Sequence, residues 1–245
     1  SDRSSARANL RRDLFRLKKS LGEEALHIER DRVSLELQGE TKVDVVEFQH
    51  WLESTQRHDH RQDRLCPDCL QALTQAAAVY RNDFMAGFGL PDSAEFDEWQ
   101  FFQNESLRRS LAQALQKLIA WHAGRMEFEQ AIEYARRWVS MDSLHEPAQR
   151  TLMQLYADSG QQAAALRQYE QLKSLLESEL GLPPEESTAS LFESIKYNRH
   201  PSEPAHNVSP DRFTMDSAAD SPALPDFEKL FLEGQENTSF VGRQE

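Results

Sequence analysis

Residues 115–143, LQKLIAWHAGRMEFEQAIEYARRWVSMDS, are matched 34 residues later by residues 149–177, QRTLMQLYADSGQQAAALRQYEQLKSLLE. The aligned pairs are Leu118 with Leu152, Ala131 with Ala165, and Trp138 with Leu172. This period is that of the tetratricopeptide repeat, a helix–turn–helix unit. A single unit cannot bury its apolar face alone, so neighbouring units must stack. The pattern therefore predicts a mainly α-helical fold with a tetratricopeptide-like module.

The flanking sequence extends this helical prediction over residues 43–197. The stretch VDVVEFQHWLES (43–54) places apolar residues on one helical face, and CLQALTQAAAVY (69–80) predicts a second helix. The next stretch, RNDFMAGFGLPDS (81–93), has the glycines and proline of an irregular loop. We expect Asp92 to cap a long helix that ends near Ala123.

The N-terminal stretch ARANLRRDLFRLKKSLG (6–22) predicts a basic amphipathic helix that stops at Gly22. Leu10, Leu14 and Leu17 share one face, which we expect to be core. Alternating apolar residues in ALHIERDRVSLEL (25–37) predict a β-hairpin. A basic helix followed by a hairpin is typical of the second half of a winged helix. A solvated amphipathic helix on a larger helical body is the alternative.

Charge is unevenly distributed along the chain. The net charge is -13, yet residues 1–22 carry seven basic and two acidic side chains, a local charge of +5 that leaves -18 elsewhere. An acidic body repels polyanions, so any contact with nucleic acid must be local to the first segment. The sequence shows no apolar run of membrane-spanning length and no secretion signal. We therefore expect a cytoplasmic protein without a membrane partner.

Four metal-binding side chains fall in the connection between the first two helices of the helical segment. The sequence HDHRQDRLCPDC (58–69) contains His58, His60, Cys66 and Cys69. Two thiolates and two imidazoles form a suitable tetrahedral set for a structural zinc ion. Two alternatives stay open: a polar helix connection with Asp68 near a helix start, and a redox pair. No other cofactor is indicated, and no nucleophile–base pair or pair of carboxylates with catalytic spacing is recognisable, so we predict that the chain is not an enzyme.

Two further sequence features concern a group of aromatic residues and the C-terminal end. Aromatic residues at helical spacing favour core positions over a ligand pocket: Phe84, Phe88, Phe96, Trp99, Phe101, Phe102, Trp121 and Trp138. Residues 199–245 hold five of the ten prolines and many polar residues. That composition predicts a disordered, flexible linker.

The residues from DFMAGFGLPDS (83–93) through both repeats to ELGLPPEEST (179–188) closely resemble the bacterial transcriptional activator domain of the antibiotic-regulatory (SARP-type) regulators. The likeness extends over about residues 43–197. In this family the module follows a winged-helix DNA-binding domain. Residues 6–22 look like its recognition helix and residues 25–37 like its wing. The last residues, SFVGRQE (239–245), look like the opening of a signalling ATPase domain.

The resemblance implies three parts: the C-terminal half of a winged helix (1–42), the activator module (43–198), and a linker to an ATPase domain (199–245). No residues for the first two helices of a winged helix precede residue 1, so we expect an internal fragment that binds DNA weakly alone. The implied DNA-binding residues are Arg3, Arg7, Asn9, Arg11, Arg12, Arg16 and Lys18. The module would dimerise, bind protein partners or relay an effector signal. A scaffold of a signalling ATPase without direct DNA binding, acting through protein interaction or autoinhibition, is the rival interpretation.

Overall fold

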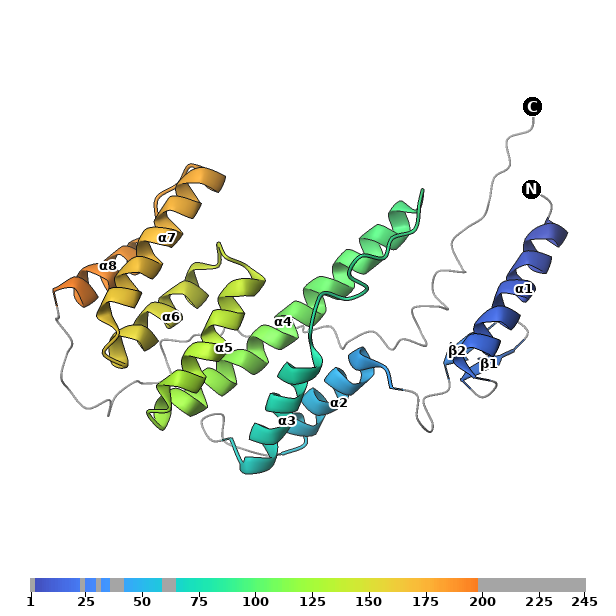
Figure 1. Cartoon of the computed structure of the whole chain (residues 1–245), viewed down its shortest axis with the longest axis horizontal. Helices are drawn as coiled ribbons and strands as arrows, with labels where there is room; N and C mark the ends of the chain where they lie inside the picture. The colour runs from blue at the N-terminus through green and yellow to red at the C-terminus, as the bar shows by residue number, and fades with distance from the viewer. Residues whose placement is uncertain (1–2, 23–24, 30–31, 36–41, 59–64, 198–245) are drawn as a thin grey trace.

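The computed structural model describes residues 3–22, 25–29, 32–35, 42–58 and 65–197. In this part of the chain, the elements are α1 (Arg3–Leu21), β1 (Leu26–Ile28), β2 (Val33–Leu35), α2 (Asp44–Gln56), α3 (Pro67–Val79), α4 (Ala94–Gly124), α5 (Phe128–Met141), α6 (Glu146–Asp158), α7 (Gln162–Leu180) and α8 (Glu186–Lys196). The prediction of a mainly α-helical fold with a small N-terminal hairpin is confirmed. Figure 1 shows α2–α8 as a row of stacked helices, with α1 and the hairpin at one end. The predicted linker, 199–245, lies outside the described residues.

The two sequence repeats fold as two consecutive helix pairs. The first repeat forms the C-terminal part of α4, from residue 115, together with α5, and the second repeat forms most of α6 and α7. The helices α5 and α6 also pack on each other, which joins the two units into one stack. The aligned alanines, Ala131 and Ala165, are fully buried, and so are the leucines aligned at the other positions. The repeat therefore places its small and large apolar residues where the helices meet.

One aligned position holds different residues and makes different contacts in the two units. In the first unit, His122 lies 2.7 Å from the Glu127 carboxylate and stacks on Tyr134. In the second unit, the Tyr156 hydroxyl accepts a hydrogen bond of 2.9 Å from Arg136 Nε. Each polar group thus has a partner, so the substitution is accommodated without leaving an unpaired buried group.

A half-buried arginine joins the repeat pairs to the preceding helices. The guanidinium of Arg137 on α5 donates hydrogen bonds to the carbonyl oxygens of Ala77 and Tyr80 at the end of α3. Burial lowers the pKa of Arg137 from its ordinary value. The last carbonyls of a helix lack partners within the helix, and a cation is favourable there. Arg137 therefore closes α3 and fixes it beside α5.

The loop between α3 and α4 is fixed by side chains of α4. Asn104 accepts a hydrogen bond of 2.6 Å from the backbone N–H of Phe84. The helix begins at Ala94 with Ser93 at the N-cap, so the prediction of Asp92 as the cap is wrong by one residue. Asp92 instead adopts a left-handed backbone with φ 60°. Asp is among the few residues that tolerate this conformation in turns, which explains the displacement.

The N-terminal helix and hairpin form as predicted. Gly22 ends α1 with φ 109°, and β1 pairs with β2 in antiparallel register, with Leu26 opposite Leu35. The expectation that Leu10, Leu14 and Leu17 are core is wrong, because Leu10 and Leu17 are 58% and 44% exposed and Leu14 is half-buried. Among the described residues, the core cluster of the helical module begins at Phe48 and includes no residue of α1.

Candidate functional sites

A cationic surface lies on α1. The exposed side chains among the predicted DNA-binding residues are those of Arg7, Asn9, Arg11, Arg12 and Arg16. Lys18 is half-buried, and the side chain of Arg3 lies outside the described part of the structure. The structure thus brings five predicted residues to the surface of one helix that leads directly into the hairpin (Figure 1).

The charges on α1 are weakly neutralised within the helix. Arg12 and Arg16 each lie 3.8 Å from the carboxylate of Asp13. These arginines are 58% and 70% exposed, and ion pairs in such positions contribute little because water and salt screen them. Either guanidinium can therefore exchange Asp13 for an external anion. Chemically, the surface suits phosphate groups, which guanidinium ions bind with paired hydrogen bonds.

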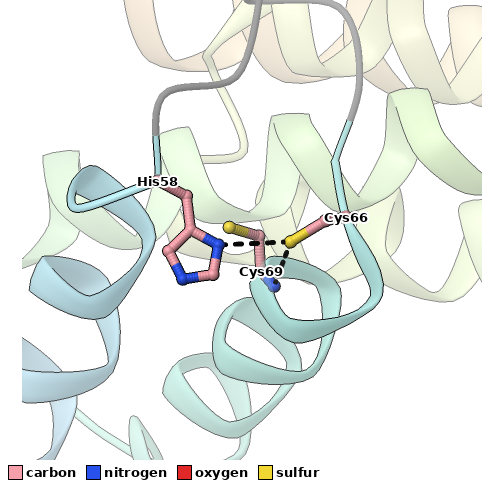
Figure 2. Close-up of side chains that lie close together, drawn as sticks. All are labelled: His58, Cys66 and Cys69. Atoms are coloured by element: carbon pink, nitrogen blue, oxygen red, sulfur yellow. Dashed lines mark hydrogen bonds between the residues drawn. The ribbon is translucent and has the colours of Figure 1, made fainter.

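Three of the four predicted metal ligands come together between α2 and α3. His58, Cys66 and Cys69 have ligand atoms that all lie within 4.8 Å of one another. Figure 2 shows His58 approaching from the end of α2 and both cysteines from the start of α3. The Nδ1 atom of His58 is 3.3 Å from Cys66 Sγ. His60 lies outside the described residues.

The two thiols of this cluster have different surroundings. Cys66 is the N-cap of α3, and its Sγ accepts a hydrogen bond of 3.4 Å from the backbone N–H of Cys69. Cys69 is 2% exposed, and its Sγ lies 3.9 Å from the carbonyl oxygen of Thr55. Burial first, and then the neighbouring Cys66, raise the pKa of the Cys69 thiol to about 11. Cys69 is therefore a protonated thiol at neutral pH unless a cation replaces its proton.

The predicted aromatic positions divide between a ring cluster, the core and the surface. Phe84 and Phe96 each contact the ring of Trp99, and Phe88 contacts Phe96. Trp138 is buried in the repeat core, whereas Phe101 and Phe102 are both 58% exposed. The prediction of core positions is therefore confirmed for Trp138 and wrong for Phe88, Phe101 and Phe102, because the side chain of Phe88 in the loop before α4 is 50% exposed and the other two lie on the surface of α4.

Sequence reasoning missed one polar group beside the loop. Arg108 on α4 donates hydrogen bonds of 2.9 and 2.5 Å to the two carboxylate oxygens of Asp83. Asp83 also accepts a hydrogen bond of 3.4 Å from the Tyr80 hydroxyl. Tyr80 and Asp83 line a surface cavity of about 270 Å³ between α2 and this loop. The partners are 25 residues apart, so no helical or strand spacing in the sequence marks the pair.

Comparison with known proteins finds a family match over the helical module. The family model of the bacterial transcriptional activator domain matches residues 43–196, which is more than half of the chain and spans α2–α8. A search of curated proteins finds no match. No helix within the described ranges is both long enough and apolar enough to cross a bilayer. The protein therefore belongs to the bacterial transcriptional activator domain family, a family of bacterial transcriptional regulators.

Proposed function

We propose that the protein regulates transcription by binding DNA through α1, with the β1–β2 hairpin as the wing. The observation that carries this proposal is the exposed cationic surface of α1 on a protein of net charge -13. The acidic remainder repels polyanions, so DNA is attracted to this helix alone. Membership of a transcriptional activator family supplies the biological context in which such a helix acts.

The roles proposed for the individual residues rest on the resemblance of α1 to a recognition helix and on its basic side chains. Arg7, Asn9 and Arg11 face base edges, since guanidinium and amide groups form paired hydrogen bonds with bases in the major groove. Four residues hold phosphates and set the orientation of the helix: Arg3, Arg12, Arg16 and Lys18. The exposed side chains of Arg7, Arg11, Arg12 and Arg16 are consistent with both roles.

The second part of the proposal concerns the helical module. Stacked helix pairs present long continuous surfaces, which repeat proteins use to bind other proteins. The acidic charge of this part of the chain disfavours nucleic acid as its partner. We infer that residues 43–196 dimerise, contact the transcription machinery or relay an effector signal to the DNA-binding helix.

The test uses the intact protein and its own DNA site. Fragmented genomic DNA retained by the protein is sequenced to identify the site, and affinity is then measured by mobility shift at fixed salt. We expect Arg7→Ala and Arg11→Ala each to weaken binding by about 1–3 kcal/mol. The matched control is Arg109→Ala, because Arg109 is an exposed arginine on α4.

The rival function is a scaffold in which α1 serves protein interaction or autoinhibition and does not touch DNA. In that case the two α1 variants bind the DNA site with the affinity of the Arg109→Ala control. Unchanged affinity, or failure of the intact protein to retain any specific fragment, would contradict the proposal. The described structure favours DNA binding, because α1 contributes no residue to the core cluster of the module.

A further inference from the structure

The cluster of His58, Cys66 and Cys69 lies where the end of α2 meets the start of α3. His58 follows the last residue of α2 by two positions, and Cys66 and Cys69 occupy the N-cap and first turn of α3. The helices α2 and α3 pack on each other, and α3 packs on α4. An ion held by these three side chains would therefore tie the end of one helix to the start of the next, at the first helix pair of the module.

The donor atoms are already close to the arrangement that a tetrahedral ion requires. Zinc–thiolate bonds of about 2.3 Å place two thiolates about 3.8 Å apart around one ion. The three donors lie within 4.8 Å of one another, so rotation of side chains by a small angle brings them to this spacing. The backbone N–H of Cys69 already donates to Cys66 Sγ, a contact of the type that stabilises a metal-bound thiolate.

Exposure decreases from one ligand to the next. His58 is exposed, Cys66 is half-buried and Cys69 is buried. A surface cavity of about 220 Å³, lined by His58, Trp51 and Asp68 among others, lies beside the cluster. An ion can thus reach His58 from solvent through this cavity, and the acidic Asp68 in its wall favours the approach of a cation.

We propose that His58, Cys66 and Cys69 bind a zinc ion that fixes the connection between α2 and α3. Two sulfur donors and one imidazole select a borderline-soft ion over magnesium or calcium, which prefer oxygen ligands. Binding replaces the two thiol protons, which leave to solvent, and His58 coordinates as the neutral ring. A fourth donor, either water or a further side chain, completes the tetrahedron.

Two other accounts of the same residues make different predictions. If Cys66 is only a helix cap, replacement by serine should preserve or improve α3, because serine is among the preferred N-cap residues. If Cys66 and Cys69 are a redox pair, mild oxidation of the purified protein should form a disulfide between them. Cys66→Ser therefore distinguishes the two roles of Cys66, because serine can still cap α3 but removes the thiolate that would bind zinc.

The first measurement is the zinc content of untagged, intact protein purified without chelator. We expect about one equivalent of zinc per chain in the wild type, as in closed structural sites. We expect a loss of at least tenfold in Cys66→Ser and His58→Gln. The matched control is His50→Gln, because His50 is an exposed histidine on α2 outside the cluster and its replacement should leave the zinc content unchanged.

The second measurement is thermal unfolding with and without a chelator, followed by reconstitution with cobalt. Chelation should lower the Tm of the wild type and of His50→Gln, and leave that of Cys66→Ser unchanged. Cobalt should give the visible bands of a tetrahedral ion and a thiolate charge-transfer band, both absent in Cys66→Ser. Less than a tenth of an equivalent of zinc in the wild type, or a Cys66–Cys69 disulfide in its place, would overturn the proposal.

Discussion

At the residue scale, the end of the module is fixed by a buried polar group. Glu146 at the start of α6 is 8% exposed and accepts hydrogen bonds from the backbone N–H of Glu185 and, at 2.5 Å, from the Thr188 hydroxyl. Arg150 donates to the same hydroxyl at 2.9 Å. A buried carboxylate without these donors would be costly, so the contacts hold the start of α8 against α6.

Replacing Thr188 by valine tests this contact with almost no change in shape. We expect Thr188→Val to lower the free energy of unfolding by about 1–3 kcal/mol, because Glu146 and Arg150 each lose a buried partner. Urea unfolding measures the change. Thr151→Val is the matched control, since the Thr151 hydroxyl is exposed and contacts only the Pro147 carbonyl of its own helix. A Thr188→Val effect equal to that of the control would contradict this role.

The ion pair of Asp83 and Arg108 gives a prediction with a defined pH dependence. Hydrogen bonds from Arg108 hold the pKa of the Asp83 carboxyl below its ordinary value. A carboxyl whose pKa is lower in the folded than in the unfolded protein stabilises the fold at pH values above its unfolded pKa, which is about 3.9. This contribution is lost as the pH falls through the folded pKa. The stability difference between wild type and Asp83→Asn should therefore be largest near neutral pH and shrink below about pH 4. A difference in urea unfolding that is constant with pH would contradict this.

The partners in these polar pairs could not be predicted from the sequence. Glu146 and Thr188 are 42 positions apart, and Asp83 and Arg108 are 25 apart. Helical periodicity relates residues three or four positions apart, so it carries no information about partners on different helices. By contrast, Cys66 and Cys69 are one helical turn apart, and that spacing is visible in the sequence.

At the element scale, the repeat predicts the fold because it encodes helix crossings. Ala131 and Ala165 occupy equivalent positions and have no exposed surface. A small side chain at such a crossing allows the two helix backbones to approach closely, and a larger one forces them apart. This is why two aligned stretches suffice to predict a stack of helix pairs.

The two alanines should therefore respond alike to enlargement. We expect Ala131→Leu and Ala165→Leu each to destabilise the protein by about 1–3 kcal/mol through overpacking. Ala163→Leu is the control, because Ala163 lies on the exposed side of α7 and has room for a larger side chain. Thermal or urea unfolding of all three variants tests the equivalence. Destabilisation at only one of the two repeat positions would show that the crossings are not equivalent.

Element boundaries and surfaces were harder to predict than element types. The helix, hairpin and long α4 all form as predicted, but α4 starts beyond Asp92 because that residue adopts a left-handed turn conformation. The leucine face of α1 satisfies the pattern of a buried stripe, yet Leu10 and Leu17 are exposed. A pattern shows that a face can be buried, whereas burial itself needs a second element.

At the scale of the whole molecule, the basic charge and the helical core belong to different parts of the chain. The helical module forms the core and carries the family match, and no described side chain of the basic α1 belongs to that core. The net charge of -13 combines a basic N-terminal helix with an acidic remainder. This division agrees with the proposed function, in which α1 contacts DNA and the helical stack contacts other proteins.

The salt dependence of DNA binding tests the central claim most directly. In the intact protein, Arg12 and Arg16 are assigned to phosphates, and each phosphate contact contributes about 0.9 to the slope of log K against log salt concentration. We predict that the Arg12→Ala, Arg16→Ala double variant weakens binding about equally for all sequences and lowers the slope by about 2, whereas Arg109→Ala leaves it unchanged. A double variant with the affinity and slope of the wild type would show that α1 does not hold the DNA backbone.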